Sequence, residues 1–189
     1  MRHTSGEHRP DPRPVDIGPL DLSARVDEAL AVQALAFGLT DDEVAVRRHI
    51  VTRHAGMRGA RALGATTEND RLVGFVYGMP NDRTQWWSTV VHPYLRQAGH
   101  ADWLSDAFAV TELHVHPAFQ HRGIGRALIT RLTDAAEEPR SILSAIDTDS
   151  PARALYRSLG YRDLADRVQF PSATSLYVVM GARLPLRHR

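Results

Sequence analysis

Two closely spaced glycines separate a strand-like segment from a helix-like one. The stretch HVHPAFQHRGIGRALITRL, residues 114–132, alternates polar and apolar residues up to Pro117, then places Gly123 and Gly125 before a helical pattern. A helix that begins after glycines leaves several backbone N–H groups without helical partners, and such groups bind phosphate oxygens. The residues therefore predict an anion-binding turn.

Two nucleotide-binding motifs share part of this pattern, but neither fits. The dinucleotide fingerprint requires a third glycine where Leu128 stands, and the Walker loop requires a lysine, which this chain lacks. What remains is a Gln-x-x-Gly-x-Gly motif at Gln120, Gly123 and Gly125, preceded by ELHVHP. A plain strand-to-helix connection, with glycines only for turning, stays the alternative.

A second segment narrows the interpretation. DTDSPARALYRSLGY, residues 147–161, contains a Leu-Tyr pair followed by Leu-Gly-Tyr, one helix and one strand after the glycine turn. Together the two segments resemble the GNAT family, the Gcn5-related N-acetyltransferases. The resemblance implies an acetyl-CoA-dependent enzyme that transfers an acetyl group directly to an amine.

The resemblance also implies which residues bind acetyl-CoA. Backbone groups of Leu113, His114 and Val115 would pair with the pantetheine arm like an extra strand. The turn would hold the pyrophosphate through Gln120, His121, Arg122, Gly123, Ile124, Gly125 and Arg126. Many relatives carry an asparagine that contacts the cofactor where the helix of residues 150–160 begins. Here Ser150 stands at that position, so the resemblance leaves open whether this contact to the cofactor is made.

Catalysis in this family requires a proton to leave the amine and another to reach the departing thiolate. The resemblance makes Tyr156 the candidate acid, although its ring could simply pack on the sheet. Glu112 is the candidate base, and it shares a strand face with His114 and His116. A structural glutamate, with a histidine or water as the base, is the alternative.

The histidines also raise the question of a metal. His114 and His116 alternate on a strand and His121 is close in sequence, a spacing that can chelate zinc. No carboxylate at a suitable spacing completes such a site. We therefore expect no metal.

The periodicity predicts an α+β mixture of strands and helices, and their order matches the GNAT fold. The resemblance implies a mixed, mostly antiparallel sheet of six to seven strands flanked by about four helices. The second helix should bury Val44, Ile50 and Val51, and Asn69-Asp70 should form a hairpin turn. The expected strands are 15–22, 59–68, 71–79, 109–116, 141–147, 161–170 and 173–184, and the expected helices are 24–37, 42–54, 124–138 and 150–160.

Residues 80–106 lack a clear period and contain all three tryptophans, Trp86, Trp87 and Trp103. We interpret them as an insertion before the central strand. Tryptophan side chains can pack in a core, form a dimer contact or line a substrate site. We favour the first two roles over the third.

Composition and charge indicate the partners, the location and the domain organisation to expect. The net charge of +1 disfavours nucleic acid, and no apolar run is long enough for a membrane span. The absence of cysteine excludes disulfides and favours the cytoplasm. We expect a disordered tail at 1–14 and one domain at 15–184. A homodimer is one option for its assembly.

The leading hypothesis is an N-acetyltransferase acting on a small amine, a protein N-terminus or a lysine. The alternative is a non-catalytic acyl-CoA sensor or interaction module on the same fold. The sequence does not identify the acceptor.

Overall fold

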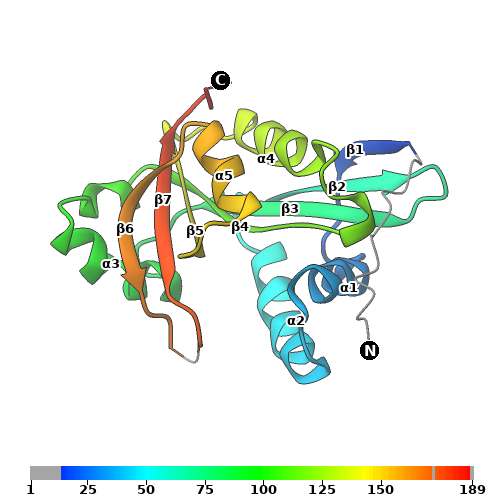
Figure 1. Ribbon diagram of the computed structural model, residues 1–189, viewed down its shortest axis with the longest axis horizontal. Helices are drawn as coiled ribbons and strands as arrows, with labels where there is room; N and C mark the ends of the chain where they lie inside the picture. The colour runs from blue at the N-terminus through cyan, green and yellow to red at the C-terminus, as the bar shows by residue number, and fades with distance from the viewer. Residues whose placement is uncertain (1–13, 172, 188–189) are drawn as a thin grey trace, which may run out of the picture. The chain divides into compact units, whose positions relative to one another are not determined.

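The computed structural model describes residues 14–171 and 173–187 (Figure 1). Apart from Pro14, the expected N-terminal tail lies outside these residues. The described helices are α1 (Val26–Phe37), α2 (Asp41–Ala55), α3 (Trp86–Gln97), α4 (Ile124–Asp134) and α5 (Pro151–Ser158), with short 3-10 helices η1 (Ala101–Leu104) and η2 (Pro117–Phe119). The strands are β1 (Val15–Pro19), β2 (Arg61–Thr67), β3 (Leu72–Pro80), β4 (Ala107–Val115), β5 (Arg140–Ile146), β6 (Arg162–Val168) and β7 (Tyr177–Arg183).

The strands form one mixed sheet in the order β1-β2-β3-β4-β5-β7-β6. Antiparallel pairing joins β1 to β2, β5 to β7 and β6 to β7, whereas β4 and β5 run parallel. The α+β class and the mixed sheet are therefore confirmed. The described residues hold five α-helices, one more than expected.

The chain divides into two compact units. The first comprises the described part of residues 1–56 together with 62–76 and 113–128. The second comprises 57–61, 77–112 and the described part of 129–189. Strands β3 and β4 each contribute residues to both units, and the units are described in turn.

In the first unit, α1 and α2 lie side by side (Figure 1). Helix α1 ends at Gly38, whose left-handed φ of 68° lets its N–H bond the Ala34 carbonyl oxygen, as expected for a glycine stop. Helix α2 begins at Asp41, and Thr40 is its N-cap. The Thr40 side chain accepts the Glu43 N–H, and Glu43 accepts the Thr40 N–H, a capping box.

The predicted apolar stripe of α2 is wrong in part. Val51 is buried and Val44 is partly buried, but Ile50 is 39% exposed. Consecutive residues lie about 100° apart around a helix. Burial of Val51 therefore places Ile50 at the edge of the packed side.

In the second unit, the tryptophan-containing segment is largely regular structure, although its sequence shows no clear period. Helix α3 buries Ser88, Val91 and Leu95, which recur at helical spacing. The helix contains Pro93 in its interior, where proline removes a hydrogen bond and normally ends a helix. This residue, with the β-branched and aromatic neighbours, hid the pattern.

The core of the second unit includes α3, η1 and the strands β5, β6 and β7. Trp103 and Leu104 of η1 pack in one cluster with Ile142, Leu164 and Val179. Gly181 on β7 is required here, since an added Cβ would lie 2.6 Å from the Trp103 ring. The tryptophan segment is thus part of the core of this unit.

Helix α4 ends at Asp134, four residues before the predicted end at Glu138. Its Thr133 hydroxyl bonds back to the Ile129 carbonyl oxygen at 2.9 Å. Pro139 disfavours helical backbone at the residue before it, so the helix had to stop before Glu138.

Candidate active site

The first unit contains the glycine turn, which connects the end of β4 to α4. The His116 side chain caps η2, because its Nδ1 accepts the Ala118 N–H at 3.1 Å. The Gln120 amide donates from Nε2 to the Val115 carbonyl oxygen at 3.0 Å. Two polar side chains therefore fix the path from the strand into the turn.

The turn itself needs unusual backbone angles. His121 and Gly123 have positive φ values of 60° and 75°, and α4 begins at the next residue, Ile124. A Cβ added at Gly123 would have no atom within 4 Å. Glycine therefore serves the left-handed conformation here, and the space beside the turn is open to a ligand.

An aromatic side chain that the sequence did not single out supports this turn. Phe119 is fully buried, its ring contacts the His116 ring edge-on, and the Arg122 guanidinium lies 5.5 Å above its centre. The contact with the ring orients Arg122. The sequence signal was a lone large apolar residue between Pro117 and Gln120.

The predicted polar face shared by Glu112, His114 and His116 is wrong for His114. The His114 side chain is 6% exposed and its ring packs between Phe37, at 5.3 Å, and Phe75, at 5.5 Å. Any contribution of His114 to a cofactor site would come from its backbone.

His116 has a second polar neighbour. Its Nε2 lies 3.2 Å from the guanidinium of Arg71, a residue that the sequence did not point to. Within the described residues, no group of three histidine, aspartate or glutamate side chains could hold a metal ion.

The second unit contains Glu112, Ser150 and Tyr156. Parallel pairing between β4 and β5 covers only Ala107, Phe108 and Ala109, opposite residues 140–142. The ladder thus ends three residues before Glu112. This parting of β4 from its neighbour agrees with the opened strand that the family resemblance implies.

Tyr156 is buried on α5, with 8% of its surface exposed. Its ring meets the Tyr161 ring edge-on at 5.8 Å, and the Tyr161 hydroxyl is hydrogen-bonded to Ser141 at 2.7 Å. Burial, and then the Glu112 carboxylate, raise the pKa of the Tyr156 phenol well above its ordinary value of 10. Tyr156 is therefore protonated at neutral pH, the form that a general acid requires.

Helix α5 begins as predicted. Ser150 is its N-cap and accepts the Arg153 N–H at 3.2 Å, and Pro151 occupies the first helical position. On the same helix, the Arg153 side chain is 11% exposed and paired with Asp147 and Asp163.

The two units thus divide the predicted residues between them. The first holds the predicted cofactor residues Leu113, His114, Val115, Gln120, His121, Arg122, Gly123, Ile124, Gly125 and Arg126. The second holds Glu112, Ser150 and Tyr156, of which Glu112 and Tyr156 are electrostatically coupled.

The sequence matches one family model, described as the acetyltransferase (GNAT) domain, over residues 59–163, more than half of the chain. A GCN5-like protein acetyltransferase of Mycobacterium tuberculosis is 29% identical over 201 residues, covering 91% of this chain and 98% of the relative.

Two solved structures illustrate the fold. The ribosomal-protein-S18-alanine N-acetyltransferase of Escherichia coli has a TM-score of 0.63 at 17% identity, over 93% of this chain and 97% of its own. The PaiA N-acetyltransferase of Thermoplasma acidophilum, solved in complex with coenzyme A, has a TM-score of 0.58 at 12% identity, over 90% of this chain and 99% of its own. The chain belongs to the GNAT family and is an acetyl-CoA-dependent N-acetyltransferase.

Proposed function

We propose that the chain acetylates a primary amine of a small molecule or of a peptide, with Glu112 and Tyr156 as its proton-transfer residues. The observation that carries this proposal is the coupling of a half-buried carboxylate to a buried, protonated phenol. One group can accept a proton at neutral pH and the other can donate one.

The proposed reaction is a direct transfer. The amine nitrogen attacks the thioester carbonyl carbon, so that an N–C bond forms and the C–S bond breaks. Glu112 takes the proton that the amine loses, directly or through water. Tyr156 donates its proton to the departing thiolate, and the net products are an amide and coenzyme A with a free thiol.

The residues of the turn fit a pyrophosphate. The open space beside the exposed Gly123, just before α4, would admit phosphate oxygens, and Arg122 and Arg126 would add positive charge. The backbone of Leu113 to Val115 would pair with the pantetheine arm. Because the Val115 carbonyl oxygen already accepts from Gln120, the other backbone groups of this stretch would make that pairing.

Relatives guide the choice of acceptor. The mycobacterial relative is a protein acetyltransferase, the Escherichia coli structure acts on an alanine of ribosomal protein S18, and another solved structure of this fold is a spermidine N-acetyltransferase. A panel of three amines represents these classes: a peptide with N-terminal alanine, a lysine-containing peptide with a blocked N-terminus, and spermidine.

Location and assembly complete the proposal. The chain would act in the cytoplasm as a single catalytic domain spanning 15–184, in line with its lack of cysteine. No helix in the described ranges is long and apolar enough to cross a membrane. Trp86, which is 58% exposed on α3, is the candidate for a contact between two copies, and sedimentation of Trp86→Ala against the wild type tests it.

Thiol release from acetyl-CoA tests the proposed reaction. Since the chain contains no cysteine, a thiol reagent detects only coenzyme A. Thiol release that requires one of the three amines supports the proposal, and binding of acetyl-CoA without turnover on any of them would favour the sensor alternative.

A further inference from the structure

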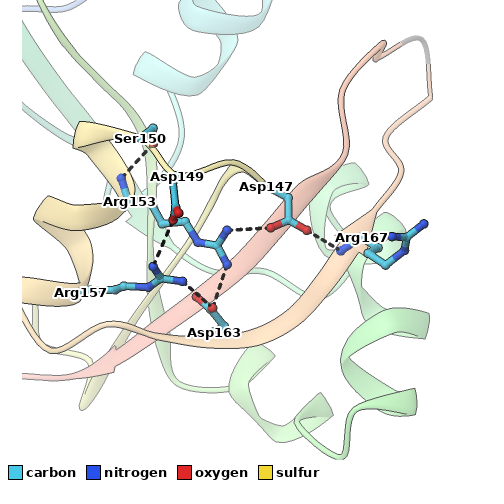
Figure 2. Close-up of polar contacts among 7 residues, drawn as sticks. All are labelled: Asp147, Asp149, Ser150, Arg153, Arg157, Asp163 and Arg167. Atoms are coloured by element: carbon cyan, nitrogen blue, oxygen red, sulfur yellow. Dashed lines mark hydrogen bonds and ion pairs between the residues drawn. The ribbon is translucent and has the colours of Figure 1, made fainter.

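Arg153 occupies the centre of a charged network in the second unit (Figure 2). Its guanidinium donates to Asp147 at 2.7 Å, just after the end of β5, and to Asp163 at 2.8 Å, on β6. The Arg153 N–H is itself held by Ser150. One side chain of α5 is therefore bonded to two different strands of the sheet.

The network continues beyond Arg153. Asp147 also accepts the backbone N–H of Arg167 at 3.3 Å, where the backbone has a positive φ of 51°. Asp163 also accepts from Arg157 at 3.1 Å, one turn further along α5. Figure 2 shows both aspartates lying between arginines.

The two arginines differ in how far they are enclosed. The Arg153 side chain is 11% exposed, whereas that of Arg157 is 47% exposed and its other carboxylate partner, Asp149, is 98% exposed. Exposed ion pairs contribute little because water and salt screen them. The Arg153 pairs are the ones that fix geometry.

Stability alone does not account for a buried arginine at this position. Removing its charge from water is costly, and among the described residues nothing accepts the N–H of its Nε. An apolar side chain would have filled the space without that cost. The planar guanidinium instead orients its hydrogen bonds, so that the angle to each carboxylate is fixed.

Helix α5 is short enough to depend on such an anchor. It has eight residues, and helices of this length do not hold themselves in water. Tyr156 lies three residues after Arg153, which is less than one turn of the helix. The position of the phenol is thus set by whatever holds α5 to the strands.

The geometry points to Arg153 as a positioning residue for Tyr156: by bridging Asp147 and Asp163 it sets the place of α5 and so the place of the phenol. This inference rests on the proposed role of Tyr156 in catalysis. Arg153 does not act on the substrate in this account.

Hydrogen exchange tests the anchoring without any acceptor. Arg153→Met removes the bridge, and Arg157→Met is the matched control, because it removes an arginine from the same helix that shares Asp163. We expect backbone amides of 152–158 to exchange about tenfold faster in Arg153→Met and less than about twofold faster in Arg157→Met. Equal acceleration in the two variants would overturn the inference.

Kinetics test the link to Tyr156. With the amine of the panel that is acetylated fastest, or with acetyl-CoA hydrolysis if none is, Arg153→Met should lower kcat about tenfold and change the KM for acetyl-CoA less than about twofold. Arg157→Met should keep the wild-type kcat. In a Tyr156→Phe background, Arg153→Met should cause no further loss. A full tenfold loss in that background would contradict the inference.

A role of Arg153 in anchoring α5 can be distinguished from the role of Tyr156 in catalysis. If Tyr156→Phe alone keeps the wild-type kcat, the proposed role of Tyr156 fails, while the exchange data still decide whether Arg153 anchors α5. If Arg153→Met does not fold, Asp147→Asn keeps the pair of Arg153 with Asp163 and weakens the contacts that Asp147 makes with Arg153 and with the Arg167 N–H. It should then accelerate exchange in α5 and lower kcat in the same direction, and wild-type values would overturn the inference.

Discussion

The Glu112 carboxylate and the Tyr156 phenol are electrostatically coupled. Burial is the larger cause that raises the pKa of Tyr156, and Glu112 is the second. The carboxylate therefore helps burial to keep the phenol protonated, which is the state that a general acid needs.

Tyr156→Phe should lower kcat about tenfold to a hundredfold and leave the KM for acetyl-CoA unchanged, because the ring remains and only the hydroxyl that donates the proton is lost. The matched control is Tyr161→Phe, which removes a buried hydroxyl bonded to Ser141. That change should lower the free energy of unfolding by about 1 kcal/mol and keep the wild-type kcat. Equal losses of kcat in both variants would assign Tyr156 to packing.

The raised pKa of Tyr156 predicts a pH dependence. A group whose pKa is raised keeps its proton as the pH rises through its ordinary value, here 10. The catalytic acid should therefore not be lost below that pH. A plot of kcat against pH should show no descending limb at or below pH 10, and a limb centred near 9 that disappears in Tyr156→Phe would contradict the raised pKa.

Glu112→Gln should lower kcat by about tenfold or more, since the amide matches the carboxylate in shape but cannot accept the proton of the amine. Glu68→Gln, at an exposed glutamate in the turn after β2, is the control and should retain kcat. A wild-type kcat in Glu112→Gln would point to a histidine or water as the base.

Gly123→Ala tests the turn against a control with the same backbone strain. Gly123 and Gly99 have φ values of 75° and 77°, and neither has an atom within 4 Å of an added Cβ. Both alanine variants should lose about 1 kcal/mol of unfolding free energy. Only Gly123→Ala should weaken acetyl-CoA binding in calorimetry, and equal affinities would remove the phosphate-binding argument.

The charged network predicts loss of stability in acid. Although burial raises the pKa of Asp163, Arg153 and Arg157 outweigh it and hold the pKa below the ordinary value of 3.8. A lowered pKa contributes stability that is present above the unfolded value and disappears as the pH falls through the folded one. The melting temperature of the wild type should therefore decrease as the pH is lowered below about 4. Asp163→Asn should show a shallower decline, and parallel curves would contradict the account.

The fold was predictable wherever sequence period and capping agreed. Gly38 after α1, Ser150 before α5 and the strands on either side of the Asn69-Asp70 turn all carried local signals, and the structure confirms them. Helix α3 was not predictable in this way, because Pro93 argues against a helix that the packing of Val91 and Leu95 nevertheless maintains.

The residues of the candidate site could be predicted only where they belong to a short sequence motif. The glycine turn and the Leu-Tyr pair named the family, and the model match confirms it. Burial could not be read from the pattern: His114 packs between two aromatic rings, and Arg153 is enclosed by aspartates from different strands. Such contacts join residues far apart in sequence, so no local window contains them.

The most direct test of the central claim is coenzyme A release measured with wild-type protein, acetyl-CoA and the panel of N-terminal alanine peptide, lysine peptide and spermidine. The account predicts thiol release that depends on one of these amines and matches the acetylated product mole for mole. Saturable binding of acetyl-CoA, with thiol release no faster than without amine for all three, would contradict it.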